Sequence, residues 1–383
     1  MKLPRYTQQD IKGKNILVRC DFDVMVNKEG VIDDYHDLRL ERLVPTVREL
    51  LAYGAQRIVL MGHRGRPAGH DDLLGMEPVR DHFEALLHMD GIHESVVLVQ
   101  DIDENPAHYE KSRILMLENL RFWPQEKKGS DAFAQRLIKW GSIYVNDSFG
   151  NSHRSDTSIS FMPSVAESAF AGPELAREVS ELSSLFETIE HPFVLILGGA
   201  KISTKLPLIQ HMVSRADSIV LGGGIANTVL AAEGYEVGKS LVEFDMIEEA
   251  KKLVSTKIVL PKDAVMQDGT VKKVDELNAD DAIMDIGPSS GKELDRILVG
   301  AKTILWNGPL GKFEDERFAR RTYELAQNIA RHLVAKTVAG GGETVETLER
   351  LGIIEDIDFV STGGGAMLAL LSGEDLPGLS ALQ

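Results

Sequence analysis

Ser361-Thr362-Gly363-Gly364-Gly365-Ala366 is a glycine run that separates two short apolar stretches. The residues before it, 357–360, are typical of a buried strand, and those after it, 367–371, are typical of the first turns of an apolar helix. Glycine lets the backbone approach an anion closely, and a helix N-terminus carries unpaired N–H groups. The run therefore predicts either a phosphate cradle or a glycine-rich connector without a ligand, and one such turn does not separate the two.

The composition is that of a soluble globular enzyme. The chain has 383 residues, enough for two domains, with 43% hydrophobic and 26% charged residues. Its formal net charge of −17 argues against general binding to nucleic acid or to an anionic membrane surface, because like charges repel. An anionic substrate would have to be held by a local cluster of cations.

Cys20 is the only cysteine, so an intrachain disulfide is excluded and a reducing compartment is expected. The first residues lack the apolar core of a signal peptide, and no run of about 18 apolar residues occurs. We therefore expect a cytoplasmic protein that does not cross a membrane.

Strands and helices are expected to alternate in the first half of the chain. The apolar runs predict strands at 15–22, 57–61, 96–99, 114–117 and 143–145, and helices at 39–52, 79–87 and 132–140. Such alternation predicts a mainly parallel sheet covered on both faces, with ligands at the carboxyl ends of the strands.

A composition shift at 162–190 predicts the connection between two domains, with an amphipathic helix over 174–187. A second series of strands is then expected at 193–197, 218–221, 258–260, 303–305 and 337–339, with a helix from about Lys205. The predicted fold class is α/β, with two doubly wound parallel-sheet domains of Rossmann type joined by a hinge helix.

Five cationic residues of the first half fall after predicted strands or at helix starts. They are Arg39, His63, Arg66, Arg121 and Arg154. A single arginine is usually a solvated surface residue, but several in the same topological place in an acidic chain indicate a shared role. Because the guanidinium group binds carboxylate and phosphate oxygens in a bidentate way, the set predicts a site for a small anion.

Glycine loops follow the predicted strands of the second half. In the loop 198–205, Lys201 and Lys205 stand four residues apart at an expected helix start, so both could reach one face. The loop is not a Walker A motif, because its glycine spacing is different. Gly222-Gly223-Gly224 precedes the small and apolar stretch 225–230, a plausible wall for a flat base.

Two further loops add an amide and carboxylates. Asn307 and Glu314 belong to the loop 306–314, and Glu343 and Thr344 follow the glycines at 340–342. A carboxylate beside phosphate-binding amides makes sense if Mg²⁺ neutralises both groups. Any one loop could be an ordinary connection, but four in series favour a nucleotide site, and the whole chain predicts a two-domain kinase-like enzyme.

The same residues make the chain resemble the phosphoglycerate kinases along its whole length. The matching stretches of the first half are Val18-Arg19-Cys20-Asp21-Phe22, Gly65-Arg66-Pro67, Leu117-Glu118-Asn119-Leu120-Arg121-Phe122, Tyr144-Val145-Asn146-Asp147, Phe149-Gly150 and His153-Arg154. Those of the second half are Leu197-Gly198-Gly199-Ala200-Lys201, Gly222-Gly223-Gly224, Trp306-Asn307-Gly308-Pro309, Phe313-Glu314, Ser361-Thr362-Gly363-Gly364-Gly365-Ala366 and Leu376-Pro377-Gly378-Leu379.

The resemblance implies the reaction 3-phosphoglycerate + MgATP ⇌ 1,3-bisphosphoglycerate + MgADP, in glycolysis and gluconeogenesis, by a monomer whose two lobes close about a hinge. It implies an N-terminal phosphoglycerate domain over 1–165, a hinge over 166–190 and a nucleotide domain over 191–360. The final segment, 361–383, would pack back at the hinge and on the N-terminal domain.

The residue roles that the resemblance implies fall into three groups. The phosphoglycerate would be bound by Asp21, Asp23, Arg39, His63, Arg66, Arg121 and Arg154. The nucleotide would be bound by Gly199, Lys201, Lys205, Gly223, Asn307, Glu314, Gly341, Gly342, Glu343 and Thr344, with Glu343 also bound to Mg²⁺. The phosphoryl group in transit would be contacted by Arg39, Lys201 and the amide of Gly364.

Two positions depart from the family pattern. Asp23 stands where the family has asparagine, and Glu343 stands where it has aspartate. A carboxylate at 23 would repel an anionic ligand, and a longer side chain at 343 would displace a metal ligand. These changes leave two alternatives open: a kinase-like paralogue with weakened activity or another acyl-phosphate substrate, and a non-catalytic nucleotide-binding regulatory module.

Overall fold

The protein is described here by a computed structural model covering residues 2–32, 37–253 and 255–383. The chain divides into two compact units, unit 1 with Met1–Ser183 and Asp375–Gln383 and unit 2 with Ser184–Glu374. The division falls within helix α8 (Pro173–Glu187), and Pro173 occupies its first position. The predicted α/β class with two mainly parallel sheets is confirmed.

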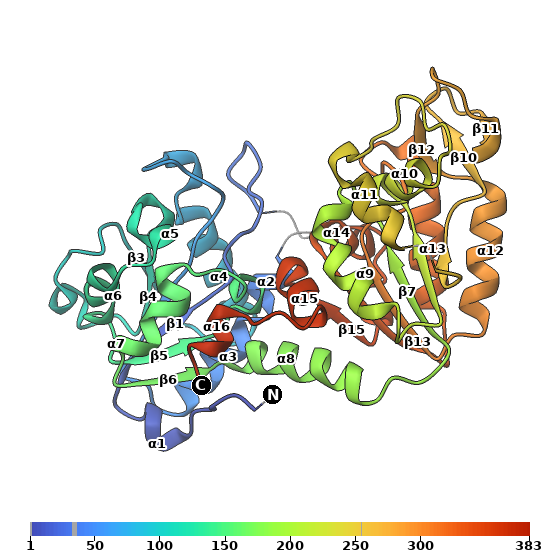
Figure 1. The fold of residues 1–383 in the computed structure, drawn as a ribbon. Coiled ribbons are helices and arrows are strands. Elements are labelled where there is room, and N and C mark those ends of the chain that lie inside the picture. Colours follow the sequence, from blue (N-terminus) through green and yellow to red (C-terminus); the bar gives the residue numbers. More distant parts are fainter. Residues whose placement is uncertain (1, 33–36, 254) are drawn as a thin grey trace. The chain divides into compact units, whose positions relative to one another are not determined.

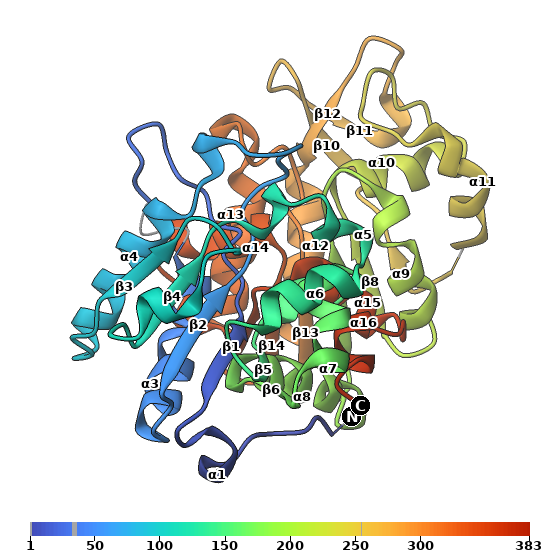
Figure 2. The same cartoon turned by 90° about the vertical axis from the view of Figure 1, so that its left-hand side faces the viewer.

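Unit 1 contains a six-stranded, all-parallel sheet of order β3-β4-β2-β1-β5-β6, which can be followed across Figure 2. Its strands are β1 (Asn15–Arg19), β2 (Arg57–Met61), β3 (Val96–Val99), β4 (Ile114–Leu117), β5 (Ile143–Asn146) and β6 (Ser168–Ala171). The sequence does not predict β6, because its Ser-Ala-Phe-Ala sequence has a weak strand pattern and it pairs only with β5.

Helices cover both faces of the unit 1 sheet (Figure 1). They are α1 (Gln8–Ile11), α2 (Leu38–Glu41), α3 (Val44–Ala52), α4 (Glu77–Met89), α5 (Gln125–Lys128), α6 (Asp131–Ile138), α7 (Met162–Val165) and α16 (Pro377–Ser380). The single helix expected over 39–52 is wrong, since two helices meet at Arg42 and Leu43. Pro45, in the first turn of α3, lacks the N–H that a continuous helix would need.

Unit 2 contains a second six-stranded parallel sheet, of order β15-β14-β13-β7-β8-β9. Its strands are β7 (Phe193–Leu197), β8 (Ser218–Leu221), β9 (Ile258–Val259), β13 (Thr303–Asn307), β14 (Lys336–Gly340) and β15 (Phe359–Ser361). Its helices are α9 (Leu206–Met212), α10 (Gly223–Ala232), α11 (Ile247–Ala250), α12 (Pro288–Val299), α13 (Arg320–Ala330), α14 (Gly342–Arg350) and α15 (Gly364–Leu371).

A three-stranded antiparallel sheet in unit 2 is absent from the sequence prediction. It has the order β11-β10-β12, with β10 (Asp263–Met266), β11 (Val271–Lys273) and β12 (Ile283–Ile286). Asp268-Gly269 joins β10 to β11, and this dipeptide between apolar runs is the signal that could have predicted the hairpin. The sheet matters for function because β12 lines a cavity.

The cores of the two units are built from the inward faces of strands and helices. In unit 2, Trp306 of β13 is buried with Leu294 of α12, Leu325 of α13 and Leu348 of α14. None of the helices in the described parts of the chain is long and apolar enough to cross a membrane.

Candidate active site

The predicted anion-binding residues of unit 1 gather at the carboxyl ends of neighbouring strands. Asp21 and Asp23 follow β1, His63 and Arg66 follow β2, Arg121 follows β4 and Arg154 follows β5. The strands β4, β2, β1 and β5 are consecutive in the sheet, so these loops lie along one edge. Ligands of parallel sheets bind at this edge, as the sequence predicts.

Asp23 is held by contacts from the loop after β2 and from helix α2. Its Oδ1 atom accepts a 2.8 Å hydrogen bond from the N–H of Gly65, and its carbonyl oxygen accepts one from the guanidinium of Arg39. Arg39 Nε lies 3.6 Å from Asp21 Oδ2, and the Asp23 N–H donates to Asp21 Oδ1 at 3.3 Å. The structure therefore brings Asp21, Asp23 and Arg39 together.

His63 is fully buried and surrounded by cations. Its Nδ1 atom lies 2.9 Å from Arg19 Nη2, and its Nε2 atom lies 4.0 Å from Asp23 Oδ2. Burial lowers the pKa of His63 well below its usual value, and repulsion from Arg19 and three other arginines lowers it further. The imidazole is therefore neutral near pH 7.

Three of the buried nitrogen atoms that have no hydrogen-bond partner in the described parts of the chain belong to predicted binding residues at this edge. They are His63 Nε2, Arg121 Nε and Arg154 Nε. The other Arg121 nitrogens are used, since Nη1 donates to Gly65 O at 2.6 Å and Nη2 lies 3.4 Å from Asp156 Oδ2. Because buried polar groups in proteins are normally satisfied, these nitrogens fit the oxygen atoms of a bound anion.

The remaining predicted residues of unit 1 differ in how they join this cluster. Arg154 influences it through charge, because it lowers the pKa of both His63 and Arg121. Arg66 is exposed, and neither a hydrogen bond nor an ion pair joins it to the residues that the structure describes. Among the predicted residues of unit 1, Arg66 is therefore the one that neither a described contact nor a described charge interaction links to the cluster.

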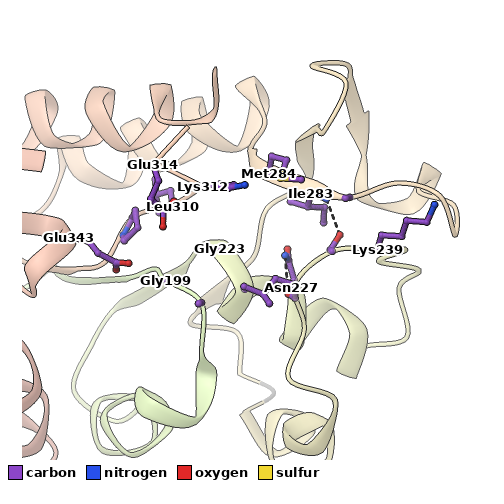
Figure 3. A pocket seen from close by; sticks show the side chains of 17 residues that line it. Gly199, Gly223, Asn227, Lys239, Ile283, Met284, Leu310, Lys312, Glu314 and Glu343 are labelled. Atoms are coloured by element: carbon purple, nitrogen blue, oxygen red, sulfur yellow. Dashed lines mark hydrogen bonds between the residues drawn. The ribbon is translucent and has the colours of Figure 1, made fainter. Parts of the chain in front are cut away.

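Unit 2 contains a cavity of about 430 Å³, within the range of small-molecule sites. It is lined by Gly199, Ala200, Gly223, Gly224, Asn227, Lys239, Ser240, Leu241, Ala282, Ile283, Met284, Pro309, Leu310, Gly311, Lys312, Glu314 and Glu343. Figure 3 shows Glu343 and Glu314 toward one end of the cavity, and Ile283, Met284 and Asn227 toward the other. The cavity thus has an acidic end and a mainly apolar end.

The wall predicted for a flat base at 225–230 is wrong except at Asn227. Ile225 and Leu230 are buried, and neither lines this cavity. The apolar lining comes instead from Leu241, Leu310 and the β12 residues Ile283 and Met284. These residues lack a local sequence signal because the antiparallel sheet carries β12 to the cavity.

Lys205 is buried and bound to the end of strand β13. Its ammonium donates to the Asn307 carbonyl oxygen at 3.2 Å and also to Asn307 Oδ1, while Asn307 Nδ2 donates to Gly340 O at 2.6 Å. Burial lowers the pKa of Lys205 to about 8, and the neighbouring Glu343 carboxylate opposes this shift. Lys205 therefore stabilises the position of Asn307 at the end of β13.

Lys201 and Lys205 do not share a helix face, contrary to the sequence prediction. A 3₁₀ turn over Ile202–Thr204 separates them, and α9 begins only at Leu206, with Pro207 in its first turn. Lys201 is exposed, whereas Lys205 points into the protein. Their chemical environments therefore differ.

Glu343 and Glu314 form the acidic end of the cavity. A Cβ atom built on Gly199 would lie 3.9 Å from Glu343 Oε2, so this carboxylate reaches the loop after β7. Desolvation by the surrounding protein raises the pKa of Glu343, Lys205 lowers it, and Glu314 raises it further. A divalent cation bound between Glu343 and Glu314 would relieve the repulsion between their carboxylates.

The donor set fits Mg²⁺ only in part. The described residues contain no group of three or more histidine, cysteine, aspartate or glutamate side chains that could hold a metal ion. Mg²⁺ commonly binds one or two carboxylates and completes its shell with substrate phosphates and water. Glu343 and Glu314 therefore suit a magnesium ion that arrives with a nucleotide.

The amides of two predicted glycines are already used within the protein. Gly199 N–H donates to Pro309 O at 2.9 Å, and Gly223 N–H donates to Leu310 O at 2.8 Å. Gly223 has a φ of +59°, and a Cβ atom there would lie 2.8 Å from Gly199 O. These glycines allow the loops to pack closely and line the cavity, and their N–H groups are hydrogen-bonded within the protein.

The starts of α14 and α15 carry amides that have no backbone partner among the described residues. The first intrahelical bonds are donated by Val345 to Gly341 O and by Met367 to Gly363 O, so the amides of 342–344 and 364–366 precede them. A Cβ atom on Gly364 would lie 2.8 Å from Gly341 Cα, which places the two helix starts together. The Thr344 hydroxyl accepts a 2.7 Å hydrogen bond from Gly308 N–H.

Comparisons with known proteins agree along the whole chain. The family model described as phosphoglycerate kinase matches residues 6–374. The phosphoglycerate kinase of Nautilia profundicola is 38% identical over 400 residues and covers 100% of both chains. That of Hydrogenobaculum sp. is 38% identical over 386 residues and covers 97% of each.

Two solved structures agree as well. Phosphoglycerate kinase from Pyrococcus horikoshii superposes with a TM-score of 0.86 at 29% identity, covering 100% of this chain and 98% of that one. The Coxiella burnetii enzyme superposes with a TM-score of 0.82 at 30% identity, covering 100% and 99%. The chain belongs to the phosphoglycerate kinase family.

Proposed function

We propose that the protein transfers a phosphoryl group between ATP and the carboxylate of 3-phosphoglycerate. The observation that carries this proposal is a trio of buried nitrogens at the carboxyl edge of the unit 1 sheet, His63 Nε2, Arg121 Nε and Arg154 Nε, which have no hydrogen-bond partner among the described residues. They suit a small substrate with several anionic oxygens. The cavity of unit 2 supplies room for a nucleotide.

In the proposed reaction the acceptor needs no general base. A carboxylate is already ionised near pH 7, so proton abstraction is not part of the step. This agrees with His63, whose buried, neutral imidazole is suited to donating a hydrogen bond rather than to accepting a proton as a general base. Arg39, Arg121 and Arg154 would balance the substrate charge in a chain of net charge −17.

The nucleotide would lie with its base at the apolar end of the unit 2 cavity and its phosphates at the acidic end. Leu241, Ile283 and Met284 would contact the base. Glu343 would hold Mg²⁺ bound to the phosphates, and that ion would neutralise part of their charge. Gly341 and Gly342 lie where the amides of the α14 start could donate to the same phosphates.

Catalysis would consist of positioning and charge stabilisation. Arg39 and the exposed Lys201 would contact the moving phosphoryl group, and the amide of Gly364 would add a fixed dipole at the start of α15. Transfer of this kind needs aligned reactants and neutralised charge more than covalent help from the protein.

A coupled assay with several acceptors tests the proposal. Purified protein is given MgATP with 3-phosphoglycerate, 2-phosphoglycerate, glycerate or acetate, and the acyl phosphate is followed through its NADH-dependent reduction. ADP formation is followed for every acceptor. We expect turnover with 3-phosphoglycerate, with kcat on the order of 1–1,000 s⁻¹.

Matched variants complete this assay. Arg39→Met and Lys201→Met should each lower kcat by at least about tenfold. The exposed cation Lys292, replaced by methionine, should leave the rate unchanged. Turnover with another carboxylate alone would contradict the substrate assignment, and nucleotide binding without any turnover would contradict the proposed activity.

A further inference from the structure

A chain of buried hydrogen bonds runs from Glu126 to His63. Ser158 donates to the Glu126 carboxylate through its hydroxyl at 2.5 Å and through its N–H at 3.0 Å. The same hydroxyl oxygen accepts from Arg19 Nε at 2.7 Å, and Arg19 Nη2 lies 2.9 Å from His63 Nδ1. All four side chains are fully buried.

The chemistry of Arg19 decides where the proton of His63 resides. A guanidinium group has only donors and stays protonated in proteins. The His63 Nδ1 atom must therefore accept, and the hydrogen of the neutral ring must be on Nε2. The network selects one tautomer of two.

The Nε2 atom of His63 faces the predicted substrate edge. It is buried without a hydrogen-bond partner among the described residues and lies 4.0 Å from Asp23 Oδ2. Arg39, Arg121 and Arg154 act on the same ring through their charges. An Nε2–H group there can donate to a substrate oxygen, whereas a bare Nε2 lone pair would repel it.

Arg19 itself is placed away from any ligand. It is the last residue of β1 and has no exposed surface. Its nitrogens are occupied by Ser158 Oγ, the Cys20 carbonyl, Ser148 Oγ at 3.5 Å and His63 Nδ1. Its influence on a substrate must therefore pass through His63.

We propose that Arg19 is a positioning residue that fixes His63 as the Nε2–H tautomer, so that a neutral imidazole donates a hydrogen bond to an oxygen of the anionic substrate. This role deepens the proposed function and rests on it for the identity of the substrate. The tautomer itself is a property of the protein without substrate.

Nitrogen NMR tests the tautomer directly. Protein labelled with ¹⁵N-histidine is examined near pH 7 without ligand, and His63 is assigned by its absence in His63→Asn. We expect the shift of an unprotonated nitrogen at Nδ1 and of a protonated one at Nε2. A protonated Nδ1, in either the other tautomer or the imidazolium, would overturn the proposal.

Variants test whether the tautomer depends on Arg19. Arg19→Met should give a mixture of tautomers. Its KM for 3-phosphoglycerate should rise about tenfold, as expected for the loss of one hydrogen bond to an ion, and its KM for ATP should stay unchanged. Arg19→Lys keeps a donor, so its KM for 3-phosphoglycerate should be close to that of the parent protein. An unaltered tautomer and KM in Arg19→Met would contradict the proposal.

Arg57 supplies the matched control. It is a buried arginine at the start of β2, and its partners among the described residues are the carbonyl oxygens of Ser112, Pro106 and Tyr109. Arg57→Met should leave the His63 spectrum and the KM unchanged, and an equal effect would show that any buried arginine matters. Because the tautomer is measured without substrate, absence of turnover would refute the proposed function without altering this result.

Discussion

The Asp23 carboxylate accepts a 2.8 Å hydrogen bond from the backbone N–H of Gly65. The side chain thereby links the loop after β1 to the loop after β2, and its second oxygen stays 4.0 Å from His63 Nε2. An asparagine oxygen could accept the same bond. The departure at this position therefore preserves the link and adds one negative charge beside the proposed anion site.

Replacing Asp23 with asparagine should tighten substrate binding. Asp23→Asn keeps the acceptor for Gly65 and removes one charge near the anion, so we expect the KM for 3-phosphoglycerate to fall about threefold to tenfold. Steady-state kinetics at constant ionic strength measures this. Asp23→Ala, which loses the acceptor too, is the control, and a KM that rises in Asp23→Asn would refute the explanation.

Glu343 should control the magnesium requirement. Glu343→Gln removes a charged ligand, and we expect the Mg²⁺ concentration for half-maximal rate to rise about tenfold with the KM for 3-phosphoglycerate unchanged. Glu343→Asp moves the carboxylate by about 1.5 Å and should change the requirement less than about threefold. Activity should disappear in excess EDTA.

Glu346→Gln is the control for that series. Glu346 lies one turn along α14 and pairs with Arg350 at 2.6 Å, outside the cavity lining. Its replacement should leave the magnesium requirement unchanged. Equal magnesium curves for Glu343→Gln and the parent protein would remove Glu343 from the proposed metal shell.

Lys205 should support nucleotide binding through Asn307. Lys205→Met removes the ammonium that bonds both oxygens of Asn307, and we expect the Kd of MgADP to rise about tenfold or more. Isothermal titration calorimetry measures this, with the thermal midpoint as a check on folding. Lys292→Met serves as the exposed-lysine control, and an unchanged Kd in Lys205→Met would contradict the role.

Asp285 should make the stability of unit 2 depend on pH. Burial raises the pKa of this carboxyl to about 7, although N–H groups of Ile286 and Arg321 donate to it. A raised folded-state pKa means that the stabilising contribution is complete below the unfolded value of about 4 and is lost as pH rises through about 7.

The comparison with Asp285→Asn isolates this effect from other titrating groups. Between about pH 5.5 and about pH 8, the unfolding free energy of the parent protein should fall on the order of 2 kcal/mol relative to the variant. Urea unfolding at both pH values gives this difference. A difference that stays constant, or that moves in the opposite direction, would be inconsistent with a buried carboxyl of raised pKa.

Local patterns were enough to predict most of the fold. Continuous apolar runs such as Phe193–Leu197 predicted the parallel strands because both faces of each strand are buried. β6 escaped prediction because its residues are partly exposed. The β10–β11 hairpin was missed although Asp268-Gly269 marks its turn, and the pairing of β12 with β10 depends on a more distant chain segment. The break between α2 and α3 followed from Pro45, which was present in the sequence.

The candidate site was predictable as a set of residues but not as a set of contacts. The cationic residues in the loops after β2, β4 and β5 could be predicted to lie near one another, because the carboxyl ends of parallel strands meet at one edge of the sheet. Arg19 was overlooked as a positioning residue because it falls inside the predicted strand 15–22, which favours a structural interpretation. The burial of Lys205 and the occupied amides of Gly199 and Gly223 depend on tertiary packing, which no local pattern encodes.

The proposed function depends most on the buried donors of unit 1, and equilibrium binding of 3-phosphoglycerate tests them most directly. Calorimetry with the parent protein and Arg154→Met, each titrated separately with 3-phosphoglycerate and MgADP, gives the answer. We expect the parent to bind both ligands, and Arg154→Met to lose at least about tenfold in affinity for 3-phosphoglycerate with MgADP affinity unchanged. Failure of the parent to bind 3-phosphoglycerate, or a loss confined to MgADP in the variant, would contradict the account.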